Sequence, residues 1–472
     1  MKRFPYLFLI IIALFSAFLF EDALAELPCH YKTQRLECGK LACNKTKNIC
    51  INCTEDADCY PAAMECILVS GKCRVKPLKK GFSYRTVLAM LGGLVVCAIG
   101  VISGAGGGGI LVPLYAASMQ LPLETAVGIS QVTVCGQSVL NVYMSSQRKF
   151  VDTMWDRPLI NYQYLSLLLP LGLLGTLFGI LNTILPDILR LIFLFSLLLI
   201  VLYRTIKKTL KQYKEDKRRR NAMSPCETNF DSSQPFAETQ ATPEEPVIHR
   251  IPQEQYPIKN LLTYVFYFIV LLVSGIIRVY CRCGGVAYWL SVIVPALILL
   301  GGFCYTYYRL NQLHSVCPDA ITFKWGRKTA LYFPLVAILA GAAGAILGIG
   351  GGMVLGFILY EINLIPDEVS VTSNVVTCFI ALTSSIRSLL KGDIPYDFAI
   401  VFCLVGVVST LLGNMVFLKY IRKHGLKFLI IMCLVLVVVG SLVATGTYGI
   451  FDLLDKKDSA GIFKFGKLCI PQ

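Results

Sequence analysis

Long apolar runs separated by short polar stretches set the pattern of this chain from about residue 84 to residue 446. A helix that crosses a bilayer needs about 20 mostly apolar residues. Ten runs meet that length, and we expect a membrane span in each: 84–103, 124–145, 162–184, 188–204, 260–279, 286–307, 329–347, 368–390, 397–418 and 426–446. Two shorter apolar pieces, 110–120 and 353–363, follow glycine clusters and predict half-helices or the return arm of a broken hairpin. The pattern predicts an all-α polytopic membrane protein.

The two glycine clusters occupy matching places in an internal repeat. Gly104–Gly108 and Gly348–Gly352 are 244 positions apart, and Pro122 and Pro366 keep that spacing. Each cluster follows a long span and precedes a short piece, a Pro corner and another span, which indicates a repeat of five hydrophobic elements. Counting spans gives the two copies opposite orientations. We therefore expect two inverted-topology repeats with glycine-broken helices, an arrangement typical of secondary transporters.

A half-helix that begins after a glycine cluster presents partial positive charge at the break, where an anion can bind. Hydroxyl and amide groups lie about one turn into each following span and can replace water around an oxyanion. Without a gap, Ser130 aligns with Asn374 and Thr133 with Thr377. The expected substrate site comprises Gly104, Gly106, Gly107, Gly108, Ser130, Gln131, Thr133, Gly348, Gly350, Gly351, Gly352, Thr372, Ser373, Asn374 and Thr377.

A structural interpretation competes with this site, because glycines also allow close helix packing and hydroxyls often bond to their own helix. Arg387, near the outer end of its span, is a further candidate for anion binding, or it extends to the interface. Glu124 and Glu368 lie at equivalent corners as helix-start charges, with proton coupling as the alternative.

The distribution of charge along the chain indicates its orientation in the membrane. The net charge is +15, and nine Lys and Arg residues lie within 204–220, so this loop should be cytosolic. The positive-inside rule explains the basic loops without nucleic acid. Residues 205–258 predict a disordered basic cytosolic linker between the first transmembrane repeat, 84–204, and a connecting transmembrane pair, 259–308. The second repeat is expected at 329–446, followed by a C-terminal tail, 447–472.

The N-terminal region predicts export. Residues 1–25 resemble a signal peptide, with an uncleaved anchor helix as the alternative. Residues 26–80 form a Cys-rich lumenal or extracellular segment with two glycosylation sequons, at Asn44 and Asn52. Its cysteines indicate disulfides, whose pairing stays open among 105 connectivities, whereas a zinc site lacks a supporting histidine. These cysteines are Cys29, Cys38, Cys43, Cys50, Cys53, Cys59, Cys66 and Cys73.

At the two glycine clusters and the spans that follow them, the sequence resembles the TauE/SafE sulfite exporter family, in its eukaryotic branch. The first signature lies at 104–113 with 126–130, and the second at 348–355 with 372–374. Arg157 to Tyr162 and Tyr288-Trp289 are similar to the eukaryotic branch. The resemblance extends from about Thr86 to Ala444, and it implies export of sulfite, sulfonate or related sulfur oxyanions, driven by an ion gradient.

Two functions follow. The first is a secondary transporter of small anions, with a coupling proton or cation, in the plasma membrane or an endomembrane. The second is a membrane receptor or adaptor whose disulfide-rich ectodomain binds a ligand. The sequence contains no nucleotide-binding loop, paired metal motif or Ser/His/Asp constellation, so we expect no enzyme activity, metal or cofactor. The substrate, the coupling ion, the oligomeric state and the host membrane stay open.

Overall fold

The computed structural model describes the chain between Cys29 and Lys456 with gaps, of which the longest are 224–254 and 420–427. Shorter gaps fall at 62, 79–81, 105, 153–154, 282–283, 319–320, 324 and 362–365, and at several positions between 30 and 48. The predicted signal peptide, most of the predicted linker and the last sixteen residues of the predicted tail therefore lie outside the described residues.

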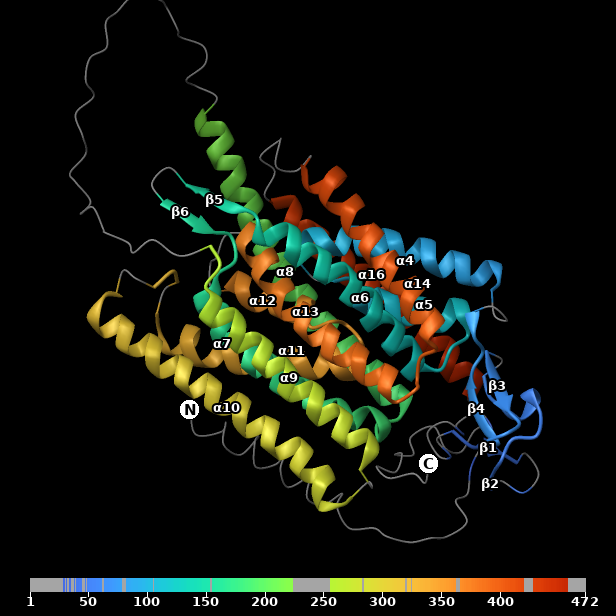
Figure 1. Cartoon of the computed structure of the whole chain (residues 1–472). Helices are drawn as coiled ribbons and strands as arrows, with labels where there is room; N and C mark the ends of the chain where they lie inside the picture. The colour runs from blue at the N-terminus through green and yellow to red at the C-terminus, as the bar shows by residue number, and fades with distance from the viewer. Residues whose placement is uncertain are drawn as a thin grey trace, which may run out of the picture.

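The described chain is mainly helical, as the sequence predicts (Figure 1). The first half contains α4 (Tyr84–Ser103), α5 (Gly108–Met119), α6 (Leu123–Ser146), α7 (Tyr162–Thr176), the 3-10 helix η3 (Leu177–Thr183) and α8 (Asp187–Met223). A hairpin of two helices follows, α9 (Ile258–Tyr280) and α10 (Val286–Val316). The second half contains α11 (Phe333–Leu347), α12 (Gly352–Glu361), α13 (Pro366–Leu390), α14 (Tyr396–Leu412) and α16 (Phe428–Lys456), with π-helices η5 (Lys328–Tyr332) and η6 (Gly413–Leu418).

Nine helices of the described part are long and apolar enough to cross a membrane, so the chain is a multi-pass membrane protein. The one remaining predicted span, 124–145, forms α6, whose 24 residues are long enough to cross a membrane. It is not among the nine, because buried polar side chains such as Gln131, Gln137 and Asn141 interrupt its apolar sequence. The half-helices α5 and α12 are confirmed at both predicted positions.

Several helix ends differ from the prediction. Helix α8 continues to Met223, so 205–223, which we assigned to a disordered linker, is helical. Lys, Arg, Gln and Glu favour helix, and extending an existing helix is much easier than starting one. Helices α10 and α16 likewise continue to Val316 and Lys456, beyond the predicted ends at 308 and 446. Helical propensity, rather than hydropathy, determines these ends.

The N-terminal region forms a small domain stapled by four disulfides, Cys29–Cys43, Cys38–Cys50, Cys53–Cys66 and Cys59–Cys73. It contains two antiparallel hairpins, β1 (Ala42–Cys43) with β2 (Cys50–Ile51), and β3 (Met64–Ile67) with β4 (Lys72–Val75). A short 3-10 helix, η2 (Asp56–Asp58), lies between the hairpins. Each hairpin has its own pair of disulfides, so two similar small units follow one another. The predicted disulfides are confirmed, and their pairing is a new finding.

The disulfide domain and a third hairpin lie at opposite ends of the helical bundle (Figure 1). The third hairpin joins α6 to α7 and pairs β5 (Lys149–Asp152) with β6 (Trp155–Pro158). At the other end, Lys40 of the disulfide domain donates a hydrogen bond from Nζ to Lys391 O, 2.7 Å away, in the turn after α13. The turn 391–395 therefore lies on the side of the disulfide domain.

The matching helices α6 and α13 run antiparallel. Thr125, at the start of α6, donates to Asp393 O beyond the end of α13 at 3.2 Å. At the other end of the bundle, Asn161 donates from Nδ2 to Glu368 Oε1 in the first turn of α13, at 2.9 Å. Two inverted copies would give this arrangement. It supports the inverted repeat, which stays a prediction.

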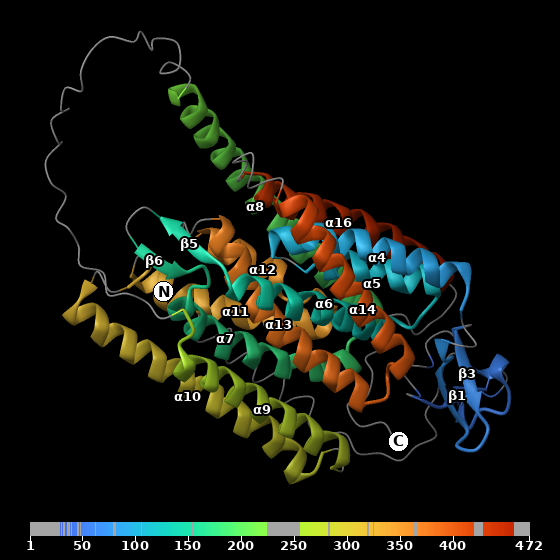
Figure 2. The same cartoon turned by 45° about the horizontal axis from the view of Figure 1, so that its top comes forward.

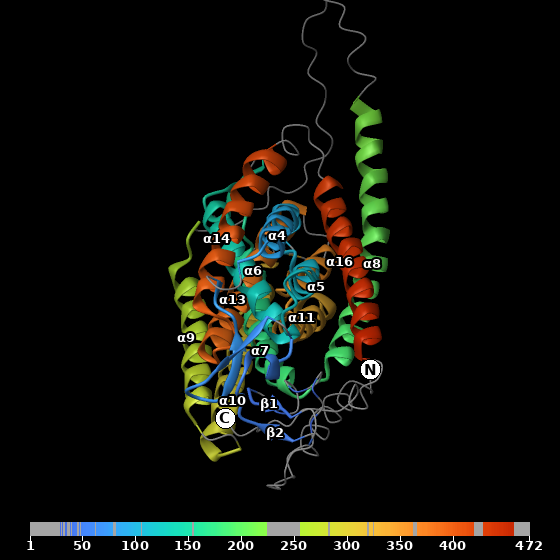
Figure 3. The same ribbon diagram turned by 90° about the vertical axis from the view of Figure 1, so that its right-hand side faces the viewer.

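The two halves are interlocked, because each packs its third long helix into the other half. Helix α14 packs on α6 and α4, and α7 packs on α11 and α13. One hydrophobic core joins α5 and α6 to α14, and another joins α7 to α11–α13. We name α4–α6 with α14 unit one, and α11–α13 with α7 unit two. Figure 3 shows α8 and α16 side by side at the edge, and Figure 2 shows α9 and α10 on another side.

Candidate functional site at the two glycine turns

The glycine clusters form two turns with the same backbone conformation. Gly104, Gly106 and Gly107 have φ of 70°, 78° and 72°, whereas Gly348, Gly350 and Gly351 have φ of 77°, 70° and 76°. This left-handed conformation is costly for residues with a Cβ atom, so three glycines at the same spacing are required in each turn. Each turn ends one helix and begins a half-helix, as we predicted at both positions.

The two turns meet in the buried centre of the bundle. A Cβ atom on Gly108 would lie 2.5 Å from Gly348 O, so the start of α5 touches the opposite turn directly. Gly106 and Gly350 face the same two side chains: Cβ atoms there would lie 3.0 and 2.9 Å from Val134 Cγ1, and 3.6 and 3.4 Å from Thr377 Cγ2. The starts of α5 and α12 therefore converge on one region, where their backbone N–H groups concentrate partial positive charge.

One buried serine from each half reaches the turn of the other half. Ser130 donates from Oγ to Gly348 O at 3.0 Å, and Ser373 donates from Oγ to Gly104 O at 3.4 Å. These contacts make Ser373, not Asn374, the partner of Ser130. The ungapped alignment at 244 positions is therefore wrong here, because the second copy has one residue fewer between turn and serine. In the corrected alignment Gln131 matches Asn374 and Val134 matches Thr377.

The threonines of the predicted site bond to backbone or to neighbouring side chains. Thr133 and Thr377 donate to carbonyls one turn earlier in their own helices, Ile129 O and Ser373 O, both at 2.9 Å. Thr377 presents its methyl group to both turns. Thr372 accepts a hydrogen bond from the Asn161 backbone N–H at 3.2 Å, toward the start of α13. In this conformation these hydroxyls stabilise the helices around the turns.

Two buried amides at equivalent positions have an acceptor without a partner. Gln131 donates from Nε2 to Gly344 O at 2.8 Å, and Asn374 donates from Nδ2 to Ser138 O at 3.3 Å. Both side chains are at most 1% exposed, and neither Gln131 Oε1 nor Asn374 Oδ1 has a hydrogen-bond partner among the described residues. A buried unsatisfied acceptor costs about 1–3 kcal/mol. Such atoms are suited to a proton donor or a cation.

Sequence reasoning missed Gln137 and Tyr115 near this centre, and it named Glu368 only as a helix-start charge or a proton-coupling group. Gln137 is fully buried and, with its amide in the orientation that satisfies both ends, donates to Gly106 O at 3.0 Å. The Tyr115 hydroxyl lies 3.3 Å from Thr133 Oγ1. Glu368 is 2% exposed and accepts from Asn161. Buried polar residues in apolar spans were the available signal, since such groups are costly and often functional.

Arg387 does not join the other predicted site residues. It follows Thr377 by ten positions on α13, about 15 Å along the helix. Its guanidinium lies against Gly179, in a separate pocket near the end of α13. The predicted set therefore divides into a central group at the glycine turns, Thr372 at the start of α13, and Arg387 near the opposite end.

Comparison with known proteins settles the family. The family model described as "Sulfite exporter TauE/SafE" matches residues 89–313 and 249–442, well over half of the chain. This chain belongs to the sulfite exporter TauE/SafE family. Among curated relatives, Arabidopsis thaliana "Sulfite exporter TauE/SafE family protein 3" is 27% identical, with 82% of this chain and 83% of the relative aligned. Family protein 1 of the same plant is also 27% identical, over 79% of this chain and 85% of the relative. No solved structure matches.

The TauE/SafE assignment makes this chain a membrane transporter. It also gives the glycine turns a context, because transporter sites lie near the midplane where helices are interrupted. The turns supply backbone N–H groups at two half-helix starts, and the two amides supply buried acceptors. An arrangement of this kind can bind an anion together with a proton or a cation.

Proposed function

We propose that this chain is a secondary transporter that exports small anions, in particular sulfite, sulfonate or related sulfur oxyanions. The meeting of the two glycine turns in the buried centre carries the proposal. The names of the Arabidopsis relatives support the substrate class. The N-terminal ends of α5 and α12, which carry partial positive charge, also support it. These half-helix starts hold the oxyanion between them.

The unpaired oxygens of Gln131 and Asn374 point to a second species beside the anion. An oxyanion offers only acceptors unless it is protonated, so it cannot satisfy these atoms by itself. A hydrogen-bearing oxyanion, or a coupling proton or monovalent cation, satisfies them and reduces the cost of burying the negative charge. We therefore propose coupled movement of the anion with a proton or cation.

Access alternates by relative movement of units one and two. Their contact includes the serine–carbonyl hydrogen bonds between α6 and the second turn and between α13 and the first turn. Because α7 and α14 are exchanged, the moving bodies are these packed units rather than the two sequence halves. In this proposal the disulfide domain faces the lumenal or extracellular side. The protein resides in the plasma membrane or an endomembrane.

Flux of sulfite and of a small sulfonate into proteoliposomes, with and without a proton gradient, tests this proposal. We expect saturable flux in the natural protein and at least a tenfold loss in Asn374→Ala and in Gln131→Ala. Both substitutions remove an acceptor at the centre and leave the glycine turns in place.

Asn141→Ala is the matched control, because Asn141 is also a buried amide of α6, but its Oδ1 accepts from Asn414 Nδ2 at 3.1 Å. Flux is normalised to the amount of folded protein, since loss of either amide also affects stability. Equal flux in all three variants would contradict the central site. Absence of flux for every sulfur oxyanion in the natural protein would contradict the substrate class and favour the receptor hypothesis.

A further inference from the structure

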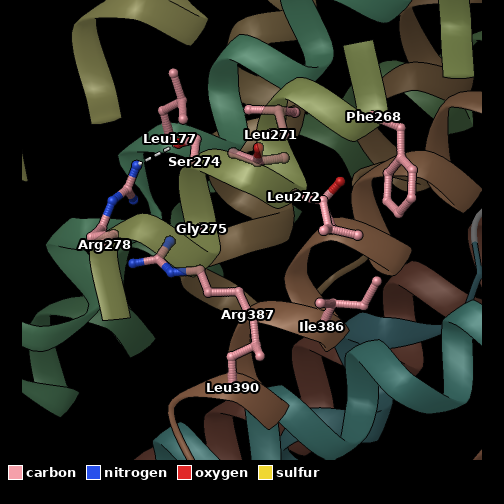
Figure 4. A pocket seen from close by; sticks show the side chains of 12 residues that line it. Leu177, Phe268, Leu271, Leu272, Ser274, Gly275, Arg278, Ile386, Arg387 and Leu390 are labelled. Carbon is pink, nitrogen blue, oxygen red and sulfur yellow. Dashed lines mark hydrogen bonds between the residues drawn. The ribbon is translucent and has the colours of Figure 1, made fainter. Parts of the chain in front are cut away.

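A second polar feature of the bundle lies in a pocket between α9, α13 and the end of α7 (Figure 4). Arg278 enters it from α9 and Arg387 from α13. Both arginines lie within three residues of the ends of their helices. The turn after α13 contacts the disulfide domain through Lys40, so the pocket lies near the end of the bundle where that domain packs.

Among the described residues no carboxylate lies within salt-bridge distance of either guanidinium group, although Asp393 is near enough to attract Arg387. Arg387 makes no hydrogen bond or ion pair with any residue that the structure describes. Arg278 donates only to neutral groups, from Nη2 to Ser291 O at 3.2 Å and, at 3.5 Å, to the hydroxyls of Ser274 and Ser291. Asp393, the acidic residue that follows α13, lies 3.8 Å from Lys391 Nζ. The two positive charges are close enough to repel each other.

Two half-buried like charges with only Asp393 nearby, itself 3.8 Å from Lys391 Nζ, are unfavourable, because each loses water and each repels the other. An anion between them removes both penalties. Each guanidinium group can bind two oxygen atoms of an oxyanion through a pair of N–H donors. The arrangement therefore lacks one negative group, of a size that two guanidinium groups can share.

The rest of the pocket is apolar. Its walls include Phe268, Leu271, Leu272, Ile386 and Leu390, and a Cβ atom on Gly275 would meet no atom within 4 Å. The two threonines that line it are already bonded, Thr176 to Leu173 O and Thr383 to Phe379 O. A fully hydrated inorganic anion would leave these walls without a contact, whereas an alkyl chain would cover them.

We propose that this pocket is a second anion site, in which Arg278 and Arg387 together bind the oxyanion head of a molecule with an apolar chain. The site is separate from the glycine turns and does not depend on the proposed transport. The same chemistry has two sources, a free alkyl sulfonate and the phosphate headgroup of a membrane lipid. Both present a negative head on an alkyl chain.

Thermal unfolding of the purified full-length protein in nonionic detergent, titrated with sodium hexanesulfonate, tests the site. We expect a saturable rise of Tm in the natural protein and at least a tenfold weaker apparent affinity in Arg278→Gln and in Arg387→Gln. Sodium sulfate at equal ionic strength should bind more weakly because it lacks the chain. Hexanol should produce no saturable rise because it lacks the charge.

Arg85→Gln is the control, since Arg85 is an exposed arginine in the first turn of α4. It should leave the hexanesulfonate affinity unchanged. Should a glutamine variant not fold, Arg278→Lys and Arg387→Lys keep the charge but lose the paired donors, and we expect at least threefold weaker binding. The proposal would be overturned if the variants at Arg278 and at Arg387 bound hexanesulfonate as tightly as the natural protein, or if hexanol raised Tm equally.

Mass spectrometry of the intact protein released from membranes separates the two sources. A phospholipid retained by the natural protein and lost from both glutamine variants identifies the lipid headgroup as the occupant. Hexanesulfonate binding without a retained phospholipid identifies a free anion. Asn374→Ala should keep the hexanesulfonate affinity, so failure of the central site and failure of this pocket give different results.

Discussion

At the scale of single residues, Ser130 and Ser373 show how the two turns are held. Each hydroxyl donates to a carbonyl that ends a helix in the other half, Gly348 O and Gly104 O. Carbonyls at a helix end have no partner within the helix, and in a membrane no water replaces it. Both serines are buried, so each hydrogen bond satisfies a carbonyl oxygen at a helix end.

Ser130→Ala and Ser373→Ala should each lower the free energy of unfolding by about 0.5–1.5 kcal/mol, because each leaves a buried carbonyl without its donor. The fall in Tm of the detergent-solubilised protein measures this effect. Ser441→Ala is the control, since this buried hydroxyl donates at 2.7 Å to Val437 O within its own helix. Equal Tm in Ser130→Ala and the natural protein would contradict the serine–turn contacts.

The glycine turns were predictable from sequence, whereas the alignment of residues around them was not. Three glycines at one spacing are legible because only glycine readily adopts φ near 70°. The shift that pairs Ser130 with Ser373 depends on the length of the connection between turn and serine, which leaves no compositional signal. Arg387 was predicted to attract an anion, but its companion Arg278 was not, because contacts between distant helices are absent from a single sequence.

At the scale of elements, close helix crossings join the exchanged helices to their new neighbours. A Cβ atom on Gly341 of α11 would overlap the backbone carbonyl of Gly172 in α7. A Cβ atom on Gly406 of α14 would overlap Thr133 O in α6. Small residues at such crossings let helix backbones approach closely, and the gain is dispersion contact along both helices.

Gly341→Ala should lower Tm by several degrees, because α7 and α11 must separate to accommodate the methyl group and overpacking typically costs about 1–3 kcal/mol. Gly301→Ala is the matched control, since Gly301 lies within α10 and a Cβ atom there would meet nothing within 4 Å. Thermal unfolding of both variants measures the difference. A fall in Tm no larger than that of Gly301→Ala would show that the crossing is looser than described.

Hydropathy predicted the existence of the helices well and their ends less well. Helix α8 continues to Met223 because its basic residues favour helix, although they cannot lie in lipid. The hairpin of β5 and β6 was missed because its strands have only four residues each, too few for an alternating pattern to be distinguished from a loop. Tertiary contacts at the end of α6 determine such short elements.

At the scale of the whole molecule, the exchange of α7 and α14 was beyond sequence reasoning. The apolar faces of the spans are chemically alike, so nothing in the sequence specifies which half each face packs against. The disulfide pairing was equally open, because the eight cysteines are too close in sequence for spacing to choose among connectivities. Both arrangements are properties of the folded molecule.

The orientation of the whole molecule in the membrane can be tested at the predicted sequons. Asn52 is exposed, and Asn44 is half-buried with its Oδ1 accepting from Lys47 N at 3.1 Å. We expect Asn52→Gln to remove one glycan when the full chain is expressed in eukaryotic cells, as judged by mobility before and after peptide N-glycosidase. Thr54→Val should have the same effect, because it removes the sequon but keeps Asn52. An unglycosylated natural protein would contradict the lumenal position of the disulfide domain.

The exchange of α14 into unit one also has a consequence for synthesis of the chain. Helix α6 contacts α14 and the following η6 through buried polar groups. Thr410 Oγ1 of α14 donates to Gln137 O, and Asn414 Nδ2 of η6 donates to Asn141 Oδ1. Ribosomes complete α6 about 250 residues before they reach α14, an interval of roughly 10–50 s at 5–20 residues per second. Helix α6, with its buried polar side chains, therefore waits through this interval for α14. During that interval the insertion machinery or a membrane chaperone must shield α6 from lipid.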